Sequence, residues 1–252
     1  MFTLQQLQSR HSVRSFQSIP LSDRQIQAVR AAISEVNSYL PGTRFQLFLD
    51  DDAPFAGKMG SYGVFKGARN YVVAVIDTGI AAIDRIAGYA GEKIVMTAVE
   101  QGLGTCFVGG TFSPDRIPAQ MRAGETIRYI IALGVPAVKE RPLARMMVSL
   151  VHRKSMKVEQ FFDATRSSMT LDEARGTFPG IDDVLEAVAC APSAVNARPV
   201  RVWIDAGRNI SLGLIKTGSF TGIDLGIAEF NASQVYPSEP DRLPDRTVLL
   251  PY

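Results

Sequence analysis

The sequence is poor in the residues that bind metals or form disulfides. It contains two histidines, His11 and His152, and two cysteines, Cys106 and Cys190. These four residues are too far apart in the sequence to show the short spacings of zinc ligands. We therefore expect neither a structural metal nor a disulfide framework. The first residues are too polar for a secretory signal, and a reducing cytoplasm is the expected compartment.

The net charge is small, and the apolar runs are short. The 27 Lys and Arg nearly balance the 25 Asp and Glu, and a net charge of +2 is too small to drive binding to nucleic-acid phosphates without a clustered patch. Apolar runs such as 71–76 are far shorter than the roughly 20 residues that span a bilayer. We predict neither nucleic acid nor a membrane as a partner.

Two common catalytic motifs are missing, the G-x-S-x-G elbow and the G-x-x-x-x-G-K-[ST] loop. The run GLGTCFVGG at 102–110 resembles a dinucleotide-binding loop, but Phe107 stands where the third glycine belongs. In addition, a helical pattern precedes these glycines and a strand-like pattern follows them. A Rossmann loop has the opposite order, because it follows a strand and precedes a helix. We interpret Gly102 as the end of a helix.

The pattern along the chain predicts helices that alternate with short strands. Ser22 and Gln25 form a capping box at the start of an amphipathic helix, and residues 45–49 then alternate like a strand. Continuous apolar runs at 71–76 and 129–133 predict central strands that are buried on both faces.

A long helix is predicted between these two runs, from about residue 84 to 100. Residues 139–161 are basic and irregular, and we interpret them as a connector. The part before the connector is therefore α/β or α+β.

Beyond the connector, the pattern of the first helix and strand returns. A shift of 155 positions superposes three apolar pairs, Ile26 with Ile181, Val29 with Val184, and Ile33 with Val188. The same shift lays the strand at 200–205 on residues 45–50. We interpret this as an internal duplication, although any amphipathic helix followed by a strand can be slid onto another.

Four motifs resemble those of the nitroreductase family of flavin enzymes. Residues 10–16, RHSVRSF, resemble its opening R-x-S-x-R-x-[FY], and residues 191–199, APSAVNARP, resemble its A-P-S-x-x-N-x-Q-P segment. The glycine run at 102–110 and ALGVP at 132–136 are similar to the family as well. Arg198 departs from the pattern, because the family has glutamine there.

The order of the motifs departs from the family too. Ordinary members carry the A-P-S-x-x-N segment shortly after the opening, and they are homodimers with the flavin between subunits. Here the segment lies in the second copy, so the resemblance implies a duplicated chain that forms its own pseudo-dimer. The expected fold is α+β and nitroreductase-like, with a mixed or antiparallel sheet flanked by helices. Residues 1–157 form the first half and residues 158–252 a shorter second half; a monomer suffices, and further dimerisation is left open.

The resemblance implies FMN as cofactor, NADH or NADPH as reductant, and a small electron-poor acceptor such as a nitroaromatic or a quinone. FMN presents a phosphate, hydroxyls and a flat ring, so its site needs cations, hydroxyls and close backbone amides. No catalytic side chain and no metal ligand is nominated. The candidate cofactor-binding residues are Arg10, His11, Ser12, Arg14, Lys66, Val108, Gly109, Gly110, Arg145, Pro192, Ser193, Ala194 and Asn196.

Arg10 and Arg14 are four residues apart. If they begin a helix, their guanidinium groups share a face and can clamp the phosphate or the pyrimidine edge; the alternative is a solvated basic turn. Arg145 resembles the family's later phosphate-binding residue, with a surface arginine as the alternative. Lys66 is a weaker candidate of the same kind.

Val108, Gly109 and Gly110 are expected to end a strand and to let the backbone approach a flat ring closely. A backbone amide at this point is suited to donate a hydrogen bond to the flavin. His11 is more consistent with a structural role in a turn, and Cys106 with a small core residue.

Each copy carries one motif that the other lacks. Thr165 and Met169 stand where a second site would need arginines, so one flavin per chain is expected. Two alternatives to an enzyme remain: a flavin-binding storage or sensor protein with little turnover, and a relic that has lost flavin. The sequence leaves open the physiological acceptor and the choice between NADH and NADPH.

Overall fold

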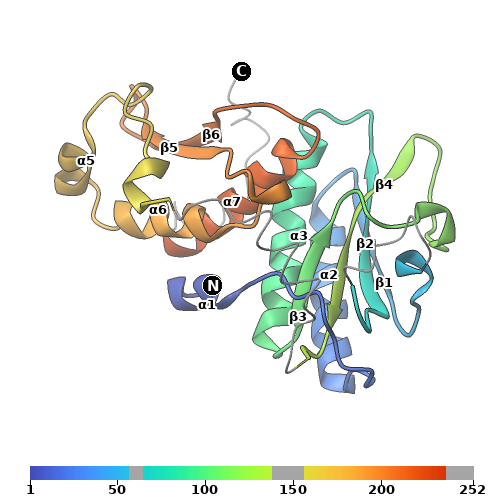
Figure 1. Cartoon of the computed structure of the whole chain (residues 1–252). Coiled ribbons are helices and arrows are strands. Elements are labelled where there is room, and N and C mark those ends of the chain that lie inside the picture. Colours follow the sequence, from blue (N-terminus) through green and yellow to red (C-terminus); the bar gives the residue numbers. More distant parts are fainter. Residues whose placement is uncertain (57–64, 138–155, 237–252) are drawn as a thin grey trace.

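The computed structural model of the chain describes residues 1–56, 65–137 and 156–236 (Figure 1). The N-terminal unit, up to residue 137, contains α1 (Leu4–Ser9), α2 (Asp23–Tyr39), β1 (Thr43–Phe48), the 3-10 helix η1 (Ala53–Phe55), β2 (Asn70–Asp77), α3 (Ile83–Glu100), β3 (Gly104–Val108), η3 (Pro114–Arg116) and β4 (Glu125–Gly134). The C-terminal unit, from residue 156, contains η4 (Val158–Phe161), α5 (Leu171–Thr177), α6 (Ile181–Cys190), η5 (Ala194–Asn196), β5 (Val200–Ile204), β6 (Ile210–Leu214) and α7 (Thr221–Val235).

The ends of the predicted helices are confirmed by their caps. The hydroxyl of Ser22 accepts from the amide of Gln25, whose side chain accepts from the Ser22 amide, so a capping box starts α2. At the end of α3, Gly102 adopts a φ of +74°, and the amide of Leu103 donates to the carbonyl of Ala98 at 3.0 Å. This left-handed glycine closes the helix, as the sequence predicts.

The N-terminal unit is built on a four-stranded antiparallel sheet in the order β1-β2-β4-β3. The two predicted central strands are confirmed, since β2 and β4 occupy the middle and residues 71–76 are buried throughout. Val72 and Ala74 face a core that includes α2 and α3, whereas Tyr71 and Val73 face the opposite core. Figure 1 shows α2 and α3 on one face of the sheet. The other face is covered by η1, η3 and the chain that follows α1.

The C-terminal unit consists of the β5-β6 hairpin packed against α6 and α7. Ile181, Val184 and Val188, which the sequence comparison superposes on the first helix, are all buried in its core. The order helix, strand, strand, helix therefore occurs twice, as α2-β1-β2-α3 and as α6-β5-β6-α7. The described part of the second unit has no counterpart of β3 and β4.

Helices α3 and α7 join the two units, and theirs is the most extensive contact between any two described elements. The backbones meet at glycines: a Cβ at Gly226 would overlap the carbonyl oxygen of Arg85, and one at Gly88 would overlap that of Ile223. Beside them the Arg85 guanidinium forms an ion pair with Glu229, with an Nε to Oε2 distance of 2.6 Å. Small residues thus set the distance between the units.

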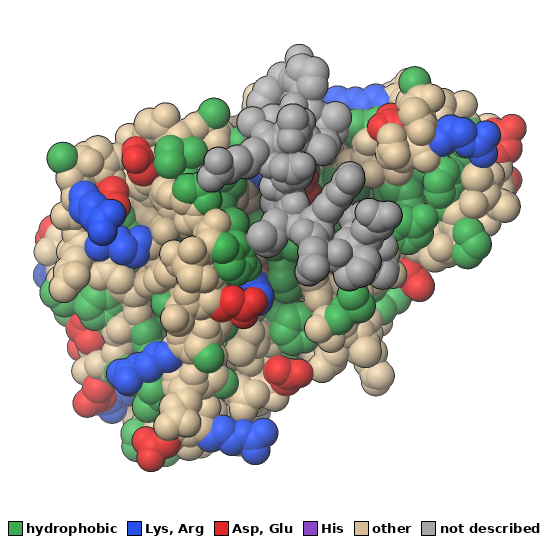
Figure 2. Space-filling view, turned by 180° about the vertical axis from the view of Figure 1, so that it is seen from behind, with side chains coloured by type: hydrophobic (Ala, Val, Ile, Leu, Met, Phe, Trp, Pro, Cys, Tyr) green, Lys and Arg blue, Asp and Glu red, His purple; other side chains and the backbone are tan. Residues whose placement is uncertain are grey.

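The outer surface agrees with the small net charge. On the face shown in Figure 2, Lys and Arg side chains are interspersed with Asp and Glu, and no patch of one sign stands out among the coloured residues. None of the described helices is long and apolar enough to cross a membrane.

We expect Gly226→Ala to lower the free energy of unfolding by about 1–3 kcal/mol, the usual range for over-packing a close contact. The backbone oxygen of Arg85 cannot rotate away, so the two helices must separate. Urea unfolding measures the change. The matched control is Gly176→Ala in α5, where a Cβ meets open space and the better helix propensity of alanine should add up to about 1 kcal/mol. Equal effects of the two substitutions would contradict the importance of this contact.

Candidate functional site

The R-x-S-x-R segment is extended, so the helix that the sequence analysis considered for residues 10–14 is wrong. The amide of Val13 donates to the carbonyl of Thr105 in β3 at 2.8 Å, and the amide of Lys66 donates to the carbonyl of Arg14 at 2.9 Å. If these residues formed a helix, neither hydrogen bond to the neighbouring segments could form. The edge of the sheet therefore decides the local conformation.

The extended backbone still places the polar residues together, because alternate side chains of an extended chain point the same way. Val13 is buried beneath the segment, while Arg10, Ser12 and Arg14 share the opposite side. All three act on Cys106 of β3: burial raises the pKa of this thiol, whereas the charges of the two arginines and a hydrogen bond with Ser12 lower it. Cys106 itself is a buried core residue, as expected.

Arg10 is buried against a carboxylate that sequence reasoning missed. Its Nε lies 3.7 Å from Oε1 of Glu92 in α3, and the two side chains are 8% and 0% exposed. Among the described residues, neither Glu92 oxygen nor the Arg10 Nε has a hydrogen-bond partner. Burial raises the pKa of Glu92 to about 7, and the charge of Arg10 opposes that rise. The sequence contains one signal for this carboxylate, because Glu92 is an acidic residue among apolar residues of α3.

The two arginines have the properties of an anion site. Within the described chain, the side chain of Arg14 and the terminal nitrogens of Arg10 form no hydrogen bond, and the only ion pair of either guanidinium is the one between Arg10 and Glu92. The guanidinium of Arg10 is buried, and its only counter-charge makes no hydrogen bond with it, so its N–H donors lack acceptors. A phosphate would accept two hydrogen bonds from it. The residues present therefore fit the phosphate of FMN. His11 is exposed, with Nδ1 3.2 Å from the carbonyl oxygen of Ser9.

The second motif forms a tight loop after α6. The hydroxyl of Ser193 accepts from the amide of Arg198 at 2.9 Å, and the side-chain oxygen of Asn196 accepts from its Nε at 3.1 Å. The amide of Ala194 donates to Oδ1 of Asp224 in α7 at 2.9 Å. Arg198, which departs from the family pattern, thus closes the loop on itself.

The backbone of this loop is strained. Val195, Asn196 and Arg198 have φ values of +47°, +52° and +47°, a region that residues other than glycine rarely adopt. Val195 is the most unusual of the three because it is β-branched, and it is 74% exposed. Strain of this kind gathers at ligand clamps and active sites. It therefore supports a binding role for the loop.

Asp224 is the second buried carboxylate that sequence reasoning missed. The residue is 4% exposed, and its Oδ2 has no hydrogen-bond partner in the described part of the chain. Burial raises the pKa of Asp224 to about 6, opposed by the Ala194 amide and the charge of Lys216. A small cavity beside it is bordered by Pro192, Ser193 and Arg198.

The structure brings the start of one motif close to the start of the other. The side chain of Gln8 in α1 donates to Glu186 of α6 at 2.7 Å. Burial raises the pKa of Cys190 to about 11, and the charge of Arg10 acts on this thiol in the opposite direction. Cys190 is the last residue of α6 and stands just before the second motif.

The glycines after β3 approach an aromatic ring of the chain itself. A Cβ at Gly109 would lie 2.7 Å from Cε1 of Phe220, whereas one at Gly110 would meet open space. The guanidinium of Arg128 lies 4.5 Å from the centroid of the Phe220 ring. One side of Gly109 is thus covered by the C-terminal unit. Val108 is buried at the end of β3.

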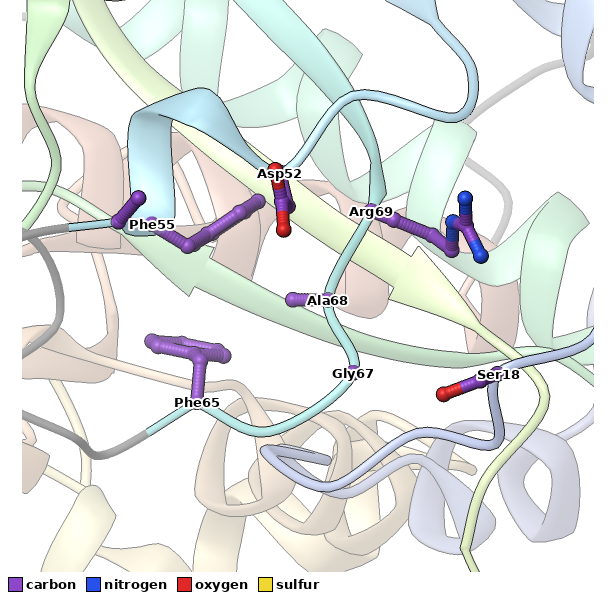
Figure 3. Close-up of a pocket in the computed structure, with 8 residues that line it drawn as sticks. Ser18, Asp52, Phe55, Phe65, Gly67, Ala68 and Arg69 are labelled. Carbon is purple, nitrogen blue, oxygen red and sulfur yellow. The ribbon is translucent and has the colours of Figure 1, made fainter.

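A cavity of about 300 Å³ lies beside the sheet, away from most of the predicted residues. Figure 3 shows Asp52 beside Phe55, with Phe65 across from them, whereas the side chain of Arg69 points away from these three residues. Lys66 is exposed and follows Phe65 directly, but none of the candidate residues lines the cavity. We assign the candidate site to the two motifs because Arg10, Glu92 and Asp224, three buried charged residues with an unsatisfied atom, lie beside them. Arg145 and His152 fall outside the described residues.

A partly buried cationic segment at the edge of an antiparallel sheet, with helices on one face, defines an α+β protein with a candidate anion site. The family model described as "Putative TM nitroreductase" matches the chain over residues 3–235. The protein belongs to this nitroreductase family, and the predicted nitroreductase-like α+β fold is confirmed. Within the described residues, no cluster of His, Cys, Asp and Glu is suited to hold a metal.

A solved structure shows the same fold. A "putative nitroreductase" from Thermotoga maritima has a TM-score of 0.59 at 21% identity, covering 93% of this chain and 83% of that one. A "putative nitroreductase in complex with fmn" from Desulfovibrio desulfuricans is similar over a smaller part of the chain, with a TM-score of 0.40 at 22% identity, covering 57% of this chain and 93% of that one. Among curated proteins, none matches the sequence significantly.

We expect Asp224→Asn to stabilise the protein more at pH 8 than at pH 4, by about 1–3 kcal/mol. Burial raises the pKa of Asp224 from 3.8 to about 6, so the folded protein binds this proton more tightly than the unfolded chain does. The free energy of unfolding of the parent therefore falls as pH rises to about 6, and the loss persists above it. Asparagine keeps the acceptor for Ala194 and cannot ionise.

Urea unfolding of variant and parent at both pH values provides this measurement. The control is Asp172→Asn, because the Asp172 side chain is 93% exposed. A difference at Asp224 that does not change with pH would contradict the assignment.

Proposed function

We propose that the protein is a flavin-dependent oxidoreductase that binds FMN and uses NADH or NADPH to reduce a small electron-poor acceptor, such as a nitroaromatic or a quinone. The observation that carries the proposal is the guanidinium of Arg10, a buried cation that makes no hydrogen bond to the described chain and lies on the same side of an extended segment as Arg14. Membership of the nitroreductase family and the FMN complex of a distant structural relative support it.

The residues of the two motifs would hold the cofactor. Arg10 and Arg14 would bind the phosphate and the pyrimidine edge, with Ser12 beside them. Backbone amides at Val108, Gly109 and Gly110 would face the ring. Lys66 and, beyond the described residues, Arg145 would add cations. The loop that contains Pro192, Ser193, Ala194 and Asn196 would close the site from the other half, and His11 remains an exposed candidate at its edge.

The chemistry needs no acid or nucleophile from the protein. Bound FMN supplies hydride transfer from a reduced nicotinamide to the acceptor. The chain itself binds and orients the cofactor and leaves one ring face accessible. Cys106 and Cys190 are unsuited to redox work, because burial raises the pKa of each thiol and keeps it protonated.

We further propose that residues 1–157 and 158–252 are the two halves of a single-chain pseudo-dimer. The repeated order helix, strand, strand, helix supports this division, as does the direct packing of α3 on α7. Ligand pockets commonly form where two units meet. Each half contributes one motif, so a chain of this kind needs no second copy to complete its site.

We expect the purified protein to take up one FMN per chain and the bound yellow chromophore to bleach rapidly when NADH or NADPH is added without oxygen. Titration against a known protein concentration counts the sites, and acid release followed by chromatography identifies the flavin. Stopped-flow absorbance then gives the rate of reduction.

Each alternative gives a different result. Binding with slow or no bleaching would indicate a storage or sensor protein, and failure to bind flavin would refute the proposal altogether. Two flavins per chain would contradict the division of motifs between halves. Recovery of only the adenine dinucleotide would contradict FMN.

We expect Arg14→Gln to weaken FMN binding by about 1.5–3 kcal/mol, the usual value of a hydrogen bond to a charged group. Glutamine keeps most of the length of the side chain and removes its charge. The matched control is Arg24→Gln on the exposed side of α2. Fluorescence titration with FMN compares the three proteins. If both variants bind as tightly as the parent, the arginines form only a solvated surface.

A further inference from the structure

We propose that Arg10 and Glu92 form a proton-coupled phosphate site, in which Glu92 takes up a proton when the phosphate of the flavin binds to Arg10. The inference rests on the proposed function and deepens it. It concerns a carboxylate on α3 that lies in neither sequence motif.

The geometry places the carboxylate close enough to the phosphate position for the two negative charges to interact. Oε1 of Glu92 is 3.7 Å from Nε of Arg10, and Glu92 is fully buried. Both of its oxygens lack a hydrogen-bond partner in the described chain, so no donor holds the carboxylate in its charged form apart from the charge of Arg10. A phosphate at the free end of the guanidinium would share the same cation.

The surroundings of Glu92 contain no second cation that acts on it within the described residues. Arg10 faces it from the segment after α1. The thiol of Cys190 in α6 and the phenol of Tyr129 in β4 also feel its charge, and both are neutral at physiological pH because burial raises their pKa values. From α7, the side chain of Asn231 lies against this cysteine, with Nδ2 3.9 Å from its Sγ; it is uncharged and donates to the carbonyl of Ala187 at 3.3 Å.

The electrostatic consequence follows from charge balance. With Glu92 ionised, the pair is neutral and attracts a phosphate weakly. With Glu92 protonated, Arg10 is an uncompensated buried cation and binds a dianion strongly. Binding and protonation are therefore linked, and each favours the other. Burial also raises the pKa of Glu92 to about 7, so the proton is gained near physiological pH.

Calorimetry on the parent protein tests the linkage without any substitution. FMN and riboflavin are titrated at pH 8 in two phosphate-free buffers that differ in their heat of ionisation. At this pH the FMN phosphate is already a dianion, since its second pKa is about 6. We expect FMN binding to take up close to one proton per flavin, and riboflavin, which lacks the phosphate, to take up close to none.

Substitution then assigns the proton to its residue. In the parent, the Kd for FMN should rise by up to about tenfold per pH unit between pH 7 and pH 9, the limit for one linked proton. Glu92→Gln should flatten this dependence and remove the proton uptake. Glu100→Gln, at the exposed end of the same helix, should leave both unchanged.

The outcomes separate this inference from the function on which it rests. Tight FMN binding with no proton uptake by the parent, or with the same pH dependence in Glu92→Gln, would overturn the inference and leave the flavoprotein intact. Equal proton uptake with FMN and riboflavin would overturn it as well, because the phosphate would then play no part. Absence of flavin binding by the parent would overturn both.

Discussion

The close approach of α3 and α7 is the contact on which the rest of the structure depends. Because Gly88 and Gly226 carry no side chain, the backbones of the two helices meet directly. This contact brings the C-terminal unit against the sheet-bearing unit. It also carries both buried carboxylates of the candidate site, since Glu92 lies on α3 beneath the first motif and Asp224 lies on α7 beneath the second.

The polar groups at this junction are incompletely satisfied in the described chain. Arg10, Glu92 and Asp224 each bury an atom without a hydrogen-bond partner, although such groups normally cost stability. The loop after α6 adds backbone strain at three left-handed residues, Val195, Asn196 and Arg198. Unsatisfied polar groups and backbone strain in the same region support the binding role that we propose for it.

Much of the fold could be predicted because its signals are local. The capping box at Ser22 and the glycine at 102 mark helix ends through their own backbone bonds, and the apolar run at 71–76 indicates a strand buried on both faces. The conformation of residues 10–14 could not be predicted in this way. Their hydrogen bonds go to Thr105 and Lys66, which are distant in sequence.

The sequence by itself determined the helices α2, α3 and α6, the strands of the larger sheet, the two motifs and the family they resemble, since spacing along the chain carries that information. It did not indicate α7, whose contact with α3 joins the two units. Only the tertiary structure decided that Arg10 is buried against Glu92 and that the second motif closes over Asp224. An acidic residue among the buried apolar residues of α3 indicates burial, but it does not indicate its partner. The partner depends on how α1, α3, α6 and α7 pack, and that packing is a property of contacts between residues far apart in the chain.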